Sequence, residues 1–294
     1  MKNILLTFLF ITCGFFGLAQ NIPVTGLYLF QLASSEGEMI LTQPVFASKF
    51  NPEGYNNQPF FFSEKEIYVT VQTKNGKQTE IYALRPDRSE LTRVTDTPES
   101  EYSPTVMPDS RFFSVVRTDA DNPSRQRLWK YPVDRRNGGE NLLPQITDIG
   151  YHAWINENEV LLFRVGDPNE LVIADIRTGL TKYVAQNPGR CFKKMQNGNI
   201  AIVHKSSADA WFIKELDVNT GILRTIVQTL GGSEDFAVLS DGSFLAARGS
   251  KIYRYKEKES SNWKLVTDLN GLGVQAVTRM DVSRGGKVIM VVKF

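Results

Sequence analysis

The stretch Glu101-Tyr-Ser-Pro-Thr-Val-Met-Pro-Asp-Ser-Arg-Phe-Phe-Ser-Val-Val116 contains a complete β-hairpin. Pro108 and Asp109 predict its tight turn, because proline presets φ at the first central position and aspartate bonds to its own backbone. A short apolar strand ends before the turn, and a second strand rich in aromatic and β-branched residues follows from Phe112. If this unit recurs along the chain, it determines the fold.

The same order of events, a polar turn that leads into an apolar strand, occurs six times. The first strand residues after the turns are 40 to 48 positions apart, at Ile67, Phe112, Val160, Ile200, Phe244 and Val288. The first five units continue with two further short segments in which apolar and polar residues alternate, as in strands with one buried face. Repeats of this length, made of strands alone, are typical of a β-propeller with four strands per blade.

The sixth unit ends at Phe294 after only two strands. The two missing strands are predicted at the other end of the chain, over Gly26–Leu32 and Glu38–Thr42. A ring closed in this way pairs sheet edges that would otherwise be exposed. We therefore predict an all-β fold, a six-bladed propeller over residues 20–294 that is closed by its N-terminal strands, and we expect a monomer.

One segment also resembles a known family. Asp96-Thr-Pro-Glu-Ser-Glu-Tyr-Ser-Pro-Thr-Val-Met-Pro-Asp-Ser-Arg111 is similar to the strand-turn-strand motif of the TolB-like, WD40-like β-propeller repeat proteins of bacterial periplasms. TolB itself carries an α/β domain ahead of its propeller, and the residues between Ala19 and Thr25 leave no room for one. The resemblance thus implies a stand-alone propeller, and the Tol and Pal partners of TolB do not simply carry over.

The N-terminal segment has the pattern of an export signal. Lys2 precedes an apolar run over Ile4–Phe16, and small residues at Gly17 and Ala19 predict cleavage that removes residues 1–19. The run is too short for a membrane span. A lipid anchor at Cys13 is the alternative, although Thr12 is not the small residue expected before a lipidated cysteine. We expect a periplasmic or secreted protein without a transmembrane span.

Charge and cysteine content narrow the possible partners. The chain has 34 basic and 32 acidic residues, a balance that gives no electrostatic reason to expect binding to nucleic acid or to an anionic membrane. After cleavage only Cys191 remains, so no intrachain disulfide can form. We interpret Cys191 as a small buried hydrophobe.

The candidate site follows from the repeat. In a propeller, the loops that enter the innermost strands gather at one mouth of the central channel, and function usually resides on such loops. Counting back nine positions from the first strand residue of each unit gives Gln58, Ser103, Tyr151, Cys191, Asp235 and Arg279. The preceding position gives Asn57, Tyr102, Gly150, Arg190, Glu234 and Thr278, and Glu101 and His152 are adjacent. We expect this rim to bind a peptide, an envelope protein or a glycan. The alternative is a set of solvated loop residues.

Catalysis is the competing hypothesis. A propeller-type hydrolase or lactonase would use His152 with Glu101, Glu234 or Asp235, and calcium could be held by oxygen atoms of Asn57 and the same acidic residues. The two histidines, His152 and His204, have no zinc-site spacing, and the chain has no Gly-x-Ser-x-Gly nucleophile motif. We therefore predict a binding module without a required cofactor, with the calcium-dependent enzyme and assistance to envelope assembly in the manner of TolB as alternatives.

Overall fold

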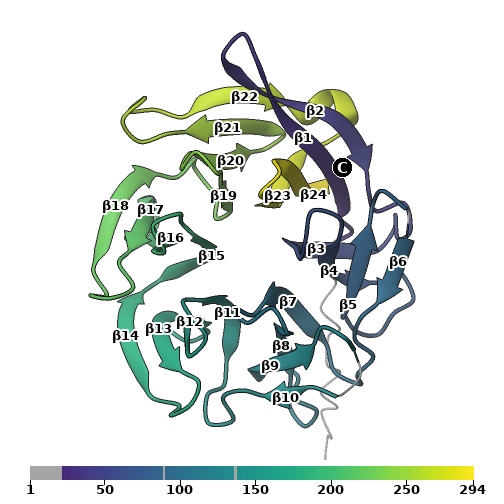
Figure 1. The fold of residues 1–294 in the computed structure, drawn as a ribbon, viewed down its shortest axis with the longest axis vertical. Helices are drawn as coiled ribbons and strands as arrows, with labels where there is room; N and C mark the ends of the chain where they lie inside the picture. Colours follow the sequence, from purple (N-terminus) through teal and green to yellow (C-terminus); the bar gives the residue numbers. More distant parts are fainter. Residues whose placement is uncertain (1–21, 89, 136–137) are drawn as a thin grey trace, which may run out of the picture.

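A computed structural model describes residues 22–88, 90–135 and 138–294. Its strands form six four-stranded antiparallel sheets, which stand as blades around a central axis (Figure 1). The chain is thus a six-bladed β-propeller, as the repeat predicts. The predicted signal peptide and Cys13 lie outside the described residues. No helix in the described part of the chain is long and apolar enough to cross a membrane.

Five blades are each built from consecutive strands, which run in chain order from the innermost strand outward. Blade 1 consists of β3 (Tyr55–Phe61), β4 (Ile67–Gln72), β5 (Glu80–Arg85) and β6 (Glu90–Arg93), and blade 2 of β7 (Glu101–Val106), β8 (Phe112–Thr118), β9 (Gln126–Pro132) and β10 (Glu140–Asn141). Blade 3 consists of β11 (Ile149–Trp154), β12 (Glu159–Arg164), β13 (Glu170–Asp175) and β14 (Thr181–Gln186). Blade 4 consists of β15 (Pro188–Lys194), β16 (Ile200–Lys205), β17 (Trp211–Leu216) and β18 (Leu223–Gln228). Blade 5 consists of β19 (Phe236–Val238), β20 (Phe244–Arg248), β21 (Lys251–Tyr255) and β22 (Lys264–Asp268), followed by the short 3-10 helix η1 (Leu269–Leu272).

Blade 6 joins the two ends of the described chain. From the centre outward its strands are β23 (Ala276–Val282), β24 (Lys287–Lys293), β1 (Gly26–Ser35) and β2 (Glu38–Phe46). The seam is a regular antiparallel pairing in which Leu27 lies opposite Val291 and Phe30 opposite Val288. The predicted closure of the ring is therefore confirmed, with N-terminal strands longer than expected.

The hydrophobic core lies between the blades. One cluster joins Leu27 and Val291 of blade 6 to Ile67 and Val69 of blade 1, and the other blade interfaces are filled in the same way. Each middle strand is covered on both faces by neighbouring blades, so it reads as a continuous apolar run, as over residues 288–292, which are all buried. This packing fixes the inner strands that carry the site.

The outer strand of blade 2 differs from the prediction. The sequence predicts a strand over residues 141–147, but β10 ends at Asn141. Pro144 has no backbone N–H for the ladder, which ends the pairing. Leu143 and Ile146 nevertheless stay buried, with the Ile146 N–H donating to the Leu143 carbonyl across 3.0 Å. The apolar side chains of this segment are therefore buried, although the residues after Asn141 do not form a strand.

The inner strands of blades 1 and 2 carry β-bulges near the channel mouth. The register shifts between Asn57 and Phe60 in β3 and between Tyr102 and Thr105 in β7. At the bulges Gln58 and Ser103 have φ values of 50° and 54°, in the left-handed region. Bulges re-aim the neighbouring side chains, so residues before and after these points face different surroundings.

Candidate functional site

A central channel of about 1100 Å³ is lined by the inner strands of all six blades. The column of residues counted back nine positions supplies one wall residue per blade, namely Gln58, Ser103, Tyr151, Cys191, Asp235 and Arg279. His152 also lines the wall. Among the described residues of the preceding column, only Arg190 lines the channel. Asn57, Tyr102 and Glu234 do not line it.

Arg279 of blade 6 reaches across the channel to blade 3. Its Nη2 donates to the Tyr151 hydroxyl across 3.0 Å, and its guanidinium carbon lies 5.2 Å from the centroid of that ring. Nη1 lies 3.7 Å from Asp235 Oδ2 of blade 5. Burial raises the pKa of Asp235, and the neighbouring cations Arg279, Lys193 and Arg190 oppose that rise. The other oxygen of Asp235 accepts the Met280 N–H across 2.9 Å.

Arg190 of blade 4 also reaches towards blade 6. Its Nη2 donates to the Thr278 carbonyl across 3.1 Å, and Nε lies 3.6 Å from Glu234 Oε2, too far for a hydrogen bond. The other oxygen of Glu234 is in ion-pair contact with Lys205. Glu234 is thus held between two cations and acts on the site through Arg190.

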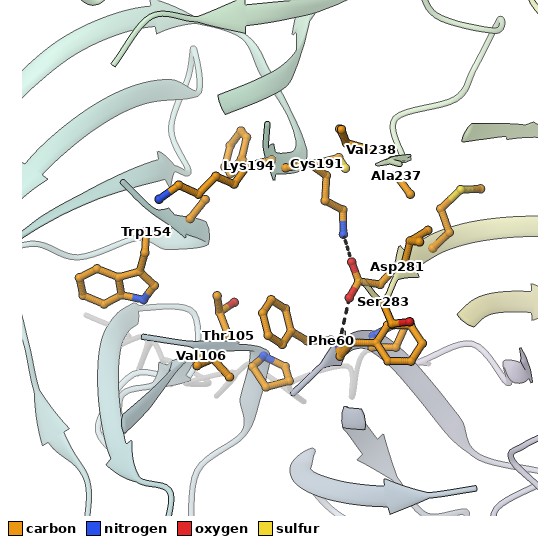
Figure 2. Close-up of a pocket in the computed structure, with 18 of the residues that line it drawn as sticks. Phe60, Thr105, Val106, Trp154, Cys191, Lys194, Ala237, Val238, Asp281 and Ser283 are labelled. Atoms are coloured by element: carbon orange, nitrogen blue, oxygen red, sulfur yellow. Dashed lines mark hydrogen bonds and ion pairs between the residues drawn. The ribbon is translucent and has the colours of Figure 1, made fainter. Parts of the chain in front are cut away.

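A second tier of charges lies deeper in the channel. Lys193 Nζ of blade 4 is 2.7 Å from Asp281 Oδ1 of blade 6, and Asp281 Oδ2 accepts the Phe61 N–H of blade 1 across 2.9 Å (Figure 2). The sequence prediction does not include this pair. Lys193 and Asp281 each follow a member of the predicted column by two residues, and alternate residues of a strand point to the same side. The same repeat alignment, read two positions further, would have found them.

His152 is bonded to a serine, and none of the carboxylates in the described part of the chain bonds to its ring. Its Nε2 lies 2.7 Å from Ser114 Oγ, which also accepts from Trp154 Nε1 across 2.9 Å. Burial lowers the pKa of His152 to about 3, so the imidazole is neutral near pH 7. Ser114 is completely buried and does not line the channel, so this Ser–His contact cannot present a nucleophile to a ligand.

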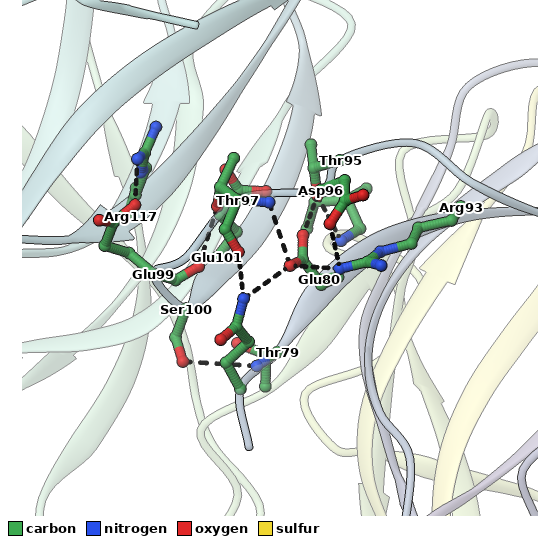
Figure 3. A network of polar contacts seen from close by, with 12 residues as sticks. Thr79, Glu80, Arg93, Thr95, Asp96, Thr97, Glu99, Ser100, Glu101 and Arg117 are labelled. Carbon is green, nitrogen blue, oxygen red and sulfur yellow. Dashed lines mark hydrogen bonds and ion pairs between the residues drawn. The ribbon is translucent and has the colours of Figure 1, made fainter. Parts of the chain in front are cut away.

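Glu101 lies between blades 1 and 2 and does not line the channel (Figure 3). It is completely buried, accepts hydrogen bonds from the Tyr131 hydroxyl and the Thr97 hydroxyl, and has one oxygen without a partner. Burial raises its pKa to about 7. The proposed catalytic set of Glu101 with His152 and Asp235 is therefore not assembled, because the bulge at Ser103 separates the channel wall from the residues before it.

The remaining predicted residues have structural partners. Asn57 Oδ1 accepts the Gln58 N–H, and Gln58 Oε1 accepts the Ser103 N–H across 3.0 Å, which ties blade 1 to blade 2 at the mouth. Cys191 is buried, as predicted, and burial raises its thiol pKa to about 12. Tyr102 packs against the core between blades 2 and 3. Within the part of the chain that the structure describes, no group of three or more His, Cys, Asp or Glu residues is arranged to hold a metal ion.

Structural comparison places the chain among propellers. It resembles the putative TolB of Agrobacterium tumefaciens with a TM-score of 0.67 at 10% identity, over 92% of this chain and 98% of that one. For TolB of Acinetobacter baumannii the TM-score is 0.57 at 14% identity, and the match covers 91% of this chain but only 64% of TolB. A nidogen/laminin complex gives 0.64 at 11% identity, over 87% and 97% of the two chains. A putative gluconolactonase gives 0.55 at 8% identity, over 81% and 88%.

No protein-family model matches the sequence, and no curated protein matches it. At these identities the likeness concerns the fold, which binding proteins and hydrolases share. The chain has the six-bladed β-propeller fold of the TolB-like proteins.

Proposed function

We propose that this protein is an exported binding propeller without catalytic activity, which recognises a peptide or protein at the channel mouth. The observation that carries the proposal is the channel wall, to which all six blades contribute and in which Tyr151, Arg190, Asp235 and Arg279 supply charged and hydrogen-bonding groups. A rigid scaffold that collects polar side chains from six separate strands is suited to recognition.

The side chains present favour binding over hydrolysis. A hydrolase needs a base within reach of a nucleophile or a bound water, and a group that stabilises the developing charge. His152 is neutral and bonded to the inaccessible Ser114, and Asp235 is engaged by the Met280 N–H and by Arg279. Glu101, the third member of the predicted constellation, is in a separate interblade network.

Two tyrosines provide a matched test. Tyr151 lies on the channel wall, whereas Tyr183 is 54% exposed on the outer strand β14. We expect Tyr151→Ala to lower binding to peptide and glycan arrays at least tenfold and Tyr183→Ala to leave it unchanged. The same preparations are assayed with ester and lactone substrates.

Two results would contradict the proposal. Equal binding by the two tyrosine variants would move recognition away from the channel. Hydrolysis by the wild-type protein that His152→Ala abolishes would establish the enzyme instead.

A further inference from the structure

Positive charge exceeds negative charge in the channel. Among the described residues that line it, five are basic and three acidic: Arg190, Lys193, Lys194, Arg279 and Arg284 against Glu64, Asp235 and Asp281. Around the mouth, Lys205 and Glu234 add one charge of each sign. The Lys193–Asp281 pair is matched, and Asp235 is left among several cations. Lys194, Arg284 and Glu64 belong to the far end of the inner strands, so the balance at the mouth is Arg190, Arg279 and Lys205 against Asp235 and Glu234. This excess of one positive charge favours an anion there.

The two arginines at the mouth keep donors to spare. Each guanidinium has five N–H groups, yet the described residues give Arg190 and Arg279 one hydrogen bond apiece, to the Thr278 carbonyl and to the Tyr151 hydroxyl. Their carboxylate contacts are loose, at 3.6 Å and 3.7 Å. The Arg190 Nε is buried and has no hydrogen-bond partner among the described residues, with Glu234 Oε2 3.6 Å away.

A carboxylate matches these donors best. A guanidinium binds a carboxylate through two parallel N–H···O bonds. The Tyr151 hydroxyl, which accepts from Arg279, still has its own proton to donate, and Tyr55 lies within electrostatic range of Tyr151 and of both arginines. Phenol hydroxyls can donate further bonds to the same anion. The site thus combines two planar cations with neutral donors.

The walls beyond the charged tier favour a peptide over a sugar. They present apolar side chains, among them Phe60, Val106, Trp154 and Val238 (Figure 2). In each blade the innermost strand has one edge unpaired within its sheet, and the backbone groups of that edge can bond an extended chain, except those already bonded by side chains, such as the Phe61 and Met280 N–H groups. Apolar pockets beside free strand edges suit peptide side chains and amides.

We propose that the mouth takes a peptide carboxylate, either a C-terminus or an acidic side chain, between Arg190 and Arg279. This assignment rests on the proposed binding function and specifies its ligand. Glu234 competes for Arg190, so it weakens this binding while keeping the arginine in place.

The test uses the full-length mature protein and two pools of fluorescent random hexapeptides without Asp or Glu, one with free C-termini and one C-amidated. A third pool carries internal Asp and Glu with amidated ends, and an oligogalacturonate provides the sugar carboxylate. Fluorescence polarisation is measured with wild type, Arg190→Gln, Glu234→Gln and Tyr151→Ala. Arg177→Gln is the control, because Arg177 is 66% exposed at a hairpin of blade 3 and pairs with Asp175.

We expect either carboxylate pool to bind at least tenfold more tightly than the C-amidated, acid-free pool. Arg190→Gln should remove that preference, Glu234→Gln should strengthen it several-fold, and Arg177→Gln should leave it unchanged. Equal binding of the pools, with loss on Tyr151→Ala, would overturn the carboxylate assignment and leave the proposed binding function standing. Binding of oligogalacturonate alone, or of no probe, would also overturn the assignment to a peptide.

Discussion

The position of Glu101 in the structure differs from the one that the sequence predicts, and its surroundings explain the difference. The repeat predicts it as part of the rim, and the structure encloses it between two blades beside Thr97 and the nearby Glu80 (Figure 3). The Tyr131 hydroxyl donates a hydrogen bond to it. Its raised pKa reports this burial. A perturbed pKa often marks a functional site, but buried structural networks produce it too.

This burial predicts a pH-dependent stability. The pKa of Glu101 is about 7 in the folded protein against its ordinary value of 4.5, so the native state binds the proton more tightly. Stability is then full below about pH 4.5 and falls until the pH passes about 7, by roughly 3 kcal/mol in total. Glu101→Gln removes that titration.

Urea unfolding at pH 4.5 and pH 8 measures the effect. The free energy of unfolding of Glu101→Gln, relative to wild type, should rise by roughly 3 kcal/mol between the two pH values. Other titrating groups cancel in this difference. A difference that does not change with pH would contradict the burial of an ionisable Glu101.

The Lys193–Asp281 pair gives a second prediction. Asp281→Ala leaves the Lys193 ammonium without its partner and frees the Phe61 N–H, so we expect a loss of about 3 kcal/mol in the free energy of unfolding. The double variant Lys193→Met/Asp281→Leu should recover most of this loss, because it removes both charges. Chemical denaturation of wild type, Asp281→Ala and the double variant measures these free energies of unfolding. A loss below about 1 kcal/mol for Asp281→Ala would show that the pair is solvated.

Among the strands, β1 closes the ring, and its packing can be compared with that of a strand inside a blade. β1 pairs with β24 along six residues and buries Leu27 and Phe30. If the seam is as well packed as a blade made of consecutive strands, truncating a seam residue should cost as much as truncating an interior one.

Leu27→Ala and Leu161→Ala compare the two cases, since both leucines are completely buried, one at the seam and one in the middle of blade 3. We expect each variant to lose about 2–5 kcal/mol and to unfold in a single transition. A much smaller loss for Leu27→Ala, or a separate early transition, would mean that the N-terminal strands are only loosely attached. Urea unfolding followed by tryptophan fluorescence and far-UV circular dichroism provides the comparison.

Elements also differ in how far the sequence predicts them. The turns that precede Ile67 and Phe112 predict strand order because their signals are local, and ring closure follows from the two strands that the sixth unit lacks and the N-terminal segment supplies. The bulges at Gln58 and Ser103 depend on neighbouring strands, so the sequence does not show that Glu101 turns away from the channel. Pro144, by contrast, is a visible signal against the last strand of blade 2.

In the molecule as a whole, the six repeats each supply residues to the wall of a single channel. The predicted column does line the channel, yet which charges meet across it could not be read from the chain, because Arg279 and Tyr151 are 128 residues apart and on blades 6 and 3. Pairings of this kind are set by the geometry of the closed ring. They leave the mouth with spare cationic donors, which are the basis of the proposed carboxylate site.

We propose that this protein recognises its partner in the channel and not along its outer edges. A photo-crosslinking amino acid placed at Thr105, on the channel wall, is compared with one at Leu180, which is 73% exposed beside the outer strand of blade 3. After irradiation in cells that produce the protein, we expect light-dependent adducts from position 105 that Arg190→Gln abolishes, and none from position 180. Adducts from position 180 alone would contradict this proposal.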